Sequence, residues 1–174
     1  FVIMFPVIIG SLTTIVIFAL VRNLAGTTAG MFAGLLFAFM PAIIQRGNLG
    51  WFKSEPLGLF LGLLSVYLFL SSIKSKTIKR TILTAAGGGL ILGLANSSWG
   101  GIQYFSIPLA MFFFALAFLR KDSIFLYGII TFTVMTLVTA GSFPRPGISF
   151  VIGLPGIALI VGTIFAIVGT VINM

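Results

Sequence analysis

Residues 45–56, QRGNLGWFKSEP, form a polar interruption between two long apolar runs. The stretch contains three of the twelve charged residues of the chain, Arg46, Lys53 and Glu55, and Glu55 is one of only two acidic residues. The apolar run on each side is about as long as a membrane-spanning helix. This pattern predicts an all-α fold in which apolar helices cross a membrane and short polar segments connect them. Because an ionisable group at the end of such a helix is costly unless it is neutralised or used, we expect function to reside here.

The composition of the whole chain supports a membrane protein. The 174 residues are 59% hydrophobic and 7% charged, with a mean hydropathy of +1.26. No soluble domain of this size could cover such a chain with polar surface. We expect a polytopic transmembrane bundle of about seven spans. Their expected ranges are 1–21, 27–44, 56–73, 81–95, 102–119, 124–140 and 148–174, the last one broken or re-entrant near Gly153 and Pro155.

The residue types that are missing exclude several kinds of chemistry. The chain has no cysteine and no histidine, which excludes thiol nucleophiles, disulfides and histidine acid/base catalysis within it. Glu55 and Asp122 are the only carboxylates, and Asp122 follows Arg120 and Lys121 in a basic connector. We therefore expect any catalytic partner of Glu55 to come from outside these residues.

The basic residues predict an orientation. The net charge of +8 comes from residues spread among the connectors, a pattern that indicates membrane topology and not nucleic-acid binding. If the first connector faces the cytoplasm, seven basic residues lie on that side and three on the other. The segments that contain Glu55, Trp99 and Arg145 then lie together on the extracytoplasmic face. An active site between helix ends would gather polar residues in this way.

Glu55 has a structural and a functional interpretation. Just before Pro56, its carboxylate would lie at a helix N-terminus, where the helix dipole favours negative charge by about 0.3–1 kcal/mol, and Ser54 could cap the same helix. Alternatively, Glu55 is one oxygen ligand of a divalent ion such as Mg²⁺ or Mn²⁺, which takes one or two carboxylates together with water and substrate. A single carboxylate would not make a complete metal site.

Three basic residues on the same face are candidate phosphate ligands. Arg46 and Lys53 could be interfacial anchors, but their position beside a carboxylate also suits a lipid-linked phosphate or diphosphate. Arg145, between two prolines, is a weaker candidate of this kind. Trp99, Gly100 and Gly101 are typical of an aromatic residue at the membrane interface followed by a tight turn. The glycine series 26, 30, 34 and 58, 62 are typical of close helix packing.

Two segments resemble the catalytic subunit of oligosaccharyltransferase in its archaeal form, a glycosyltransferase of the GT-C type. Residues 25–74, AGTTAGMFAGLLFAFMPAIIQRGNLGWFKSEPLGLFLGLLSVYLFLSSIK, are similar to the family stretch AGLLAA…P…SR…AG…DNE and the span after it. Residues 97–112, SSWGGIQYFSIPLAMF, are similar to its AWGGYVF-type segment. The order of helices and the sides of the connectors also agree.

The resemblance implies transfer of a glycan from a dolichyl phosphate or diphosphate carrier to Asn in Asn-x-Ser/Thr of an acceptor polypeptide. It implies a multi-pass protein of the plasma membrane and a divalent metal, Mg²⁺ or Mn²⁺, for which Glu55 matches the last acidic residue of a motif. Lys53 matches the first Asp of that motif. At an effective dielectric constant of about 20, a cation 4 Å from a metal ion is repelled by about 4 kcal/mol for each unit of charge product. Either Lys53 points toward phosphate or the metal site is altered.

The family's first acidic motif, its later re-entrant loop and its soluble domain with a WWDYG motif are not in these residues. We therefore expect residues 1–174 to be a transmembrane fragment of a longer protein, inactive by itself. The alternatives are another transferase that uses a polyprenyl-phosphate sugar, such as a mannosyltransferase, and a transporter-like bundle without catalysis. Against a transporter, the polar residues gather at one face and not at the membrane midplane.

Overall fold

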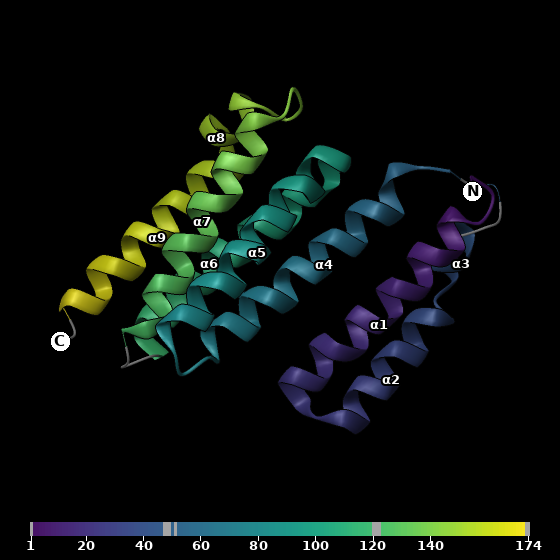
Figure 1. Ribbon diagram of the computed structural model, residues 1–174, viewed down its shortest axis with the longest axis horizontal. Helices are drawn as coiled ribbons and strands as arrows, with labels where there is room; N and C mark the ends of the chain where they lie inside the picture. The colour runs from purple at the N-terminus through teal and green to yellow at the C-terminus, as the bar shows by residue number, and fades with distance from the viewer. Residues whose placement is uncertain (1, 47–49, 51, 120–122, 173–174) are drawn as a thin grey trace.

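The computed structural model of the chain is a helical bundle that describes residues 2–46, 50, 52–119 and 123–172. Its long helices run roughly side by side, and the two termini lie at opposite ends of the longest axis (Figure 1). The helices in this part of the chain are α1 (Phe5–Ala25), α2 (Thr27–Ala38), α3 (Pro41–Arg46), α4 (Ser54–Ile73), α5 (Ile78–Ser98), the 3₁₀ turn η1 (Gly100–Ile102), α6 (Gln103–Leu119), α7 (Ile124–Ser142), α8 (Ile148–Ile152) and α9 (Leu154–Ile172).

Six of these helices, counting η1 with α6, are long and apolar enough to cross a membrane. The prediction of a polytopic helix bundle is therefore confirmed, but the expected second span is divided into α2 and α3. Pro41 explains the division, because proline has no N–H to continue the helix and disfavours helical geometry at the residue before it. Each half alone is shorter than the hydrocarbon layer.

Helix α5 is longer than the sequence suggested. Three polar residues that we expected in a turn extend α5 to Ser98. Their side chains donate to backbone carbonyls of the preceding turn, Asn96 Nδ2 to Leu92 at 2.8 Å, and Ser97 and Ser98 Oγ to Gly93 and Ala95 at 3.0 and 2.8 Å. Since these hydrogen bonds give the three side-chain donors local acceptors, the helix can continue through them; Asn96 Oδ1 is buried without a hydrogen-bond partner in the described part of the chain.

The last span is interrupted as expected, with α8 ending at Ile152 and α9 beginning at Leu154 on the other side of Gly153. Pro155 lies in the first turn of α9, where its missing N–H has no intrahelical acceptor to lose. Whether this segment is re-entrant in the membrane stays a prediction.

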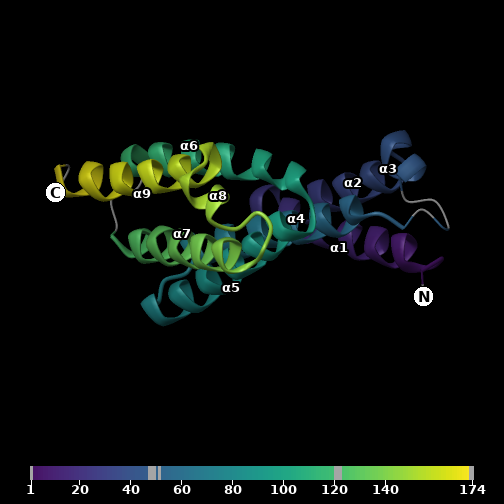
Figure 2. The same ribbon diagram turned by 90° about the horizontal axis from the view of Figure 1, so that it is seen from above.

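The helices form two layers around α4. Figure 2 shows α6 and α9 together on one side and α5 and α7 on the other, while α1 and α2 pack against each other and α1 packs on α4. A cluster of three fully buried phenylalanines joins the layers: the ring centroid of Phe69 lies 4.7 Å from that of Phe132 and 5.2 Å from that of Phe113. These rings come from α4, α7 and α6, so the cluster fixes how the layers meet.

Hydrogen bonds between helices add specificity to this packing. Ser65 of α4 donates to the backbone carbonyl of Gly88 in α5 at 2.7 Å. The hydroxyls of Thr133 in α7 and Thr163 in α9 lie 2.8 Å apart. In a lipid environment such polar contacts associate helices, because hydrocarbon offers the hydroxyls no alternative partner.

The predicted role of the glycines is confirmed at four of five positions. A Cβ added to Gly30 would lie 2.8 Å from the Phe18 carbonyl oxygen of α1, and Gly34 also faces α1. Gly58 and Gly62 face the segment 99–105. The prediction was wrong for Gly26, which ends α1 with a φ of 90° and has open space around it. Its function is the tight α1–α2 turn, since glycine adopts a positive φ without strain.

Gly89→Ala in α5 tests this close packing. The added Cβ would overlap the backbone carbonyl of Phe132 in α7, which cannot move without moving the helix. We expect Gly89→Ala to destabilise the full-length protein by about 1–3 kcal/mol. The matched control is Gly87→Ala, two residues away, where the nearest atom would be 3.9 Å from the new Cβ; it should be neutral or stabilising by up to about 1 kcal/mol. Thermal unfolding in detergent measures both, and equal effects would contradict the packing described here.

Candidate functional site

The connectors before α4, after α5 and between α7 and α8 lie at the same end of the bundle, the upper end in Figure 1. The α1–α2 and α4–α5 connectors lie at the opposite end. The structure thus places the segments of Glu55, Trp99 and Arg145 at one end, as the helix count predicts. Which compartment this end faces stays a prediction.

Glu55 lies in the first turn of α4, as predicted, and its side chain is half-buried. The helix begins at Ser54, and Lys53 occupies the N-cap position in an extended conformation (φ −132°, ψ 161°). The proposal of Ser54 as the cap was therefore one residue off, since Ser54 is inside the helix. Pro56 is in the first turn, where its missing N–H breaks no helical hydrogen bond.

Trp99 ends α5 and packs directly on the first turns of α4. Its backbone N–H donates to the Ala95 carbonyl at 3.0 Å, and its backbone is then extended. A Cβ added to Gly58 would lie 2.7 Å from the Trp99 Cβ, and one added to Gly101 would lie 2.5 Å from the indole ring. Both glycines are needed for Trp99 to lie here. Gly100 has open space around it, so its position in the motif has no packing explanation in the described part.

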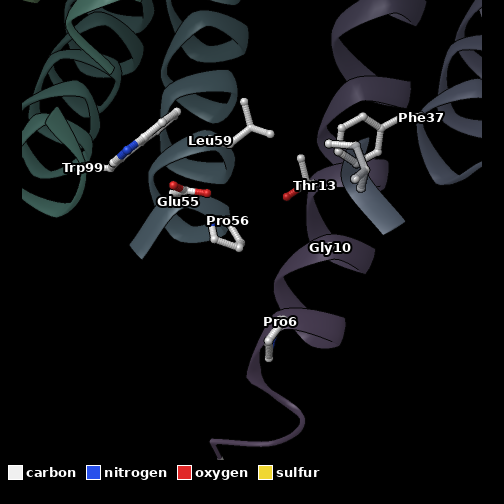
Figure 3. A pocket seen from close by; sticks show the side chains of 9 residues that line it. Pro6, Gly10, Thr13, Phe37, Glu55, Pro56, Leu59 and Trp99 are labelled. Carbon is white, nitrogen blue, oxygen red and sulfur yellow. The ribbon is translucent and has the colours of Figure 1, made fainter. Parts of the chain in front are cut away.

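Glu55 and Trp99 line one cavity of about 130 Å³ between α1 and α4. Figure 3 shows both on the α4 side, with Thr13 facing them from α1. The walls are otherwise apolar or glycine: Pro6, Gly10, Phe37, Ile43, Pro56 and Leu59. A cavity needs only about 10–15 Å³ of this kind of volume to hold one water, so this one can hold several waters or a partly hydrated ion.

Sequence reasoning missed the α1 wall of this cavity. Thr13 is buried (2% exposed), and its hydroxyl donates to the Ile9 carbonyl at 2.7 Å. A hydroxyl oxygen has two lone pairs, so Thr13 can also accept a hydrogen bond from the cavity. The signal was the spacing of Pro6, Gly10 and Thr13, which puts three small or polar residues on one face of a helix.

The basic candidates are less closely gathered. Lys53 is exposed and lies two residues before Glu55, at the start of α4. Arg145 is exposed in the α7–α8 connector and is not among the residues that line the cavity. Arg46 is the last residue of α3, and its side chain lies outside the described part, as do Trp51, Arg120, Lys121 and Asp122.

The donor set fits a metal ion only in part. Within the part of the chain that the structure describes, no group of three or more Asp, Glu, His or Cys residues is placed to hold an ion. Glu55 could supply one oxygen ligand from the cavity wall. The other ligands would have to come from elsewhere in the protein.

The family model "Oligosaccharyl transferase STT3, N-terminal" matches residues 1–172. The chain belongs to this family. The resemblance of the two motif segments is thereby confirmed, and the interpretations as a mannosyltransferase or a transporter-like bundle are not favoured. The long apolar helices and the family together make the protein an integral, multi-pass membrane protein.

Relatives and a solved structure agree with the assignment. The chain is 27% identical over 115 residues to a dolichyl-diphosphooligosaccharide–protein glycosyltransferase subunit STT3B of Arabidopsis thaliana, covering 66% of this chain and 15% of that one. It is 29% identical over 92 residues to STT3B of Oryza sativa subsp. japonica, covering 53% and 12%. The fold is similar to that of the Archaeoglobus fulgidus oligosaccharyltransferase, crystallised with Zn and sulfate, with a TM-score of 0.77, 19% identity and coverage of 99% of this chain and 24% of that one.

The STT3-family chain therefore spans between about an eighth and a quarter of the length of these relatives. The family model shows the family. Because the similar proteins come from plants and an archaeon, an archaeal origin of this chain stays a prediction. The absence of a soluble domain from these residues also stays a prediction.

Gly58→Ala tests the contact between α4 and Trp99. In a Trp51→Phe background, Trp99 is the single remaining tryptophan of these residues, and its emission reports its surroundings. The added Cβ should displace Trp99, so we expect a shifted emission maximum and stronger acrylamide quenching. The control is Gly10→Ala, which lines the same cavity but would meet nothing within 4 Å. An unchanged spectrum for Gly58→Ala would contradict the contact.

Proposed function

We propose that this chain is part of a membrane oligosaccharyltransferase that transfers a glycan from a dolichyl phosphate or diphosphate carrier to Asn in Asn-x-Ser/Thr of an acceptor polypeptide. The supporting observation is the cavity in which Glu55 and Trp99, 44 residues apart in sequence, lie together at one end of the bundle. Family membership supports the reaction class. In this proposal the site faces the extracytoplasmic side of the plasma membrane, and the remaining site residues come from the rest of the protein.

In this reaction the Asn amide nitrogen forms a bond to the anomeric carbon of the glycan. The bond from that carbon to the phosphate oxygen breaks, its electron pair leaves with the carrier phosphate, and the amide proton is lost to a base or to water. Negative charge therefore develops on the phosphate, and fixed positive charge near it lowers the barrier. Arg46 and Lys53 are our candidates to contact the phosphate, with Arg145 as a more distant contributor.

We assign Glu55 a metal-binding function in this scheme. At the cavity wall it is placed to provide one ligand to a divalent metal, for which Mg²⁺ and Mn²⁺ are the physiological candidates; the zinc in the archaeal neighbour supports a divalent ion in general. Such an ion would supply positive charge beside the leaving phosphate. Apart from Glu55 and Thr13 the cavity walls are mostly apolar and offer few hydrogen-bond partners to a sugar, so we place the glycan outside the cavity.

Lys53 next to a metal would be unfavourable by Coulomb repulsion. Its exposed position before α4, outside the residues that line the cavity, supports the alternative in which it points toward phosphate. We therefore propose that the metal lies in the cavity beside Glu55 and that the Lys53 side chain points out of the cavity toward the phosphate.

Glu55→Gln in the full-length enzyme tests the proposal. The amide keeps the size of the side chain but removes the charge, so glycan transfer from the lipid carrier to an Asn-x-Ser/Thr peptide should fall by about a hundredfold, the scale of losing one electrostatic group at a reacting centre. Expression and thermal stability should be unchanged. The concentration of Mg²⁺ or Mn²⁺ needed for half-maximal thermal stabilisation should increase as well.

The matched control is Ser54→Ala, the exposed neighbour of Glu55 on the same helical turn, which should leave transfer within about twofold of the wild type. Full activity of Glu55→Gln would remove Glu55 from the site. A comparable loss in both variants would indicate that the start of α4 is needed only structurally.

A further inference from the structure

A second polar cavity lies at the end of the bundle opposite Glu55, between the end of α1, the end of α4 and the start of α5. Its volume is about 460 Å³, and its walls include Asn23, Ser71, Lys74, Lys76, Thr77 and Arg80. We propose that this cavity binds the phosphate of an anionic phospholipid headgroup. This site is independent of the proposed glycan-transfer site. If the basic residues served only to orient the protein in the membrane, they would not need to line a cavity.

A hydrogen-bond network holds one cation at this cavity. The Lys74 ammonium donates to the backbone carbonyl of Asn23 and to its side-chain oxygen, the latter at 3.1 Å. Asn23 Nδ2 donates in turn to Ser71 Oγ at 3.2 Å. An ammonium has three donors, so Lys74 retains one for a ligand while the network fixes its place between α1 and α4. A site with a positioned donor loses less entropy on binding.

The remaining charges in this cavity are also positive. Lys76 and Arg80 flank the N-terminus of α5, where the helix dipole adds partial positive charge. Among the residues that the structure describes, none that lines the cavity is acidic. Glu55 is at the other end of α4, 19 residues from Lys74, or about 28 Å at 1.5 Å per residue. Three cations and a helix N-terminus therefore line the described part of the cavity, which suits a phosphate.

The surroundings favour a lipid over a soluble phosphate. Leu24 beside Asn23 is 58% exposed, and Ile78 and Leu83 of α5 are 45% and 73% exposed. These exposed apolar side chains are on helices long and apolar enough to cross a membrane, each within three residues in sequence of one that lines the cavity. A phospholipid can place its headgroup in the cavity and its acyl chains along this surface, and basic pockets between helix ends suit such headgroups.

The test uses two double variants that remove the same charge from the same end of the full-length protein. Lys76→Gln/Arg80→Gln removes cavity cations, whereas Arg22→Gln/Lys79→Gln removes exposed cations that do not line the cavity. Binding of short-chain phosphatidylglycerol to protein in neutral-lipid nanodiscs is measured by native mass spectrometry. If each cation contributes about fivefold, the cavity variant should bind about 25-fold more weakly, and the control variant within about threefold of the wild type.

A third variant, Ser71→Leu, keeps every charge and fills part of the cavity, so it should also weaken lipid binding if the headgroup enters. Glycerol 3-phosphate is the soluble probe and should compete only at concentrations far above those of the lipid. Equal losses in the two double variants, normal binding by Ser71→Leu, or glycerol 3-phosphate binding as tightly as the lipid would each overturn the proposal.

Discussion

Hydrocarbon cannot hydrogen-bond to the peptide backbone, and the rest of this structure depends on that constraint. Irregular backbone is confined to helix ends, because each unsatisfied N–H or C=O in lipid costs several kcal/mol. In a bundle of antiparallel spans, alternate connectors then meet at the same end. The start of α4 and the end of α5 are brought together in this way, and Glu55 and Trp99 line one cavity although 44 residues separate them.

Holding helices together in lipid requires close packing, since there is little hydrophobic gain from associating two apolar surfaces already in hydrocarbon. Glycines supply that closeness where α1 meets α2 and where α5 meets α7. The phenylalanine cluster of α4, α6 and α7 fills the space between the layers. Gly58 connects packing with function, because the same small residue that lets the chain after α5 approach α4 also positions Trp99 beside the cavity.

Much of this architecture follows from the sequence, because long apolar runs and glycine spacing report directly on membrane helices. The helix that carries Glu55 and the shared end of three connectors were predicted correctly. Helix bounds were less accurate where side chains satisfy the backbone, as Asn96 and Ser98 do, or where Pro41 divides a span. The spacing of Pro6, Gly10 and Thr13 marks one face of α1, but which helix that face meets could not be predicted, because it depends on how the whole bundle packs.

The account depends most directly on the compartment shared by the connectors before α4 and between α7 and α8. Because these residues contain no cysteine, Lys53→Cys, Arg145→Cys and Lys76→Cys can be introduced one at a time into full-length protein cleared of other cysteines. A membrane-impermeant maleimide added to intact cells should label positions 53 and 145, and should label position 76 only after permeabilisation. Labelling of positions 53 and 76 from the same side would contradict the account, as would labelling of positions 53 and 145 from opposite sides.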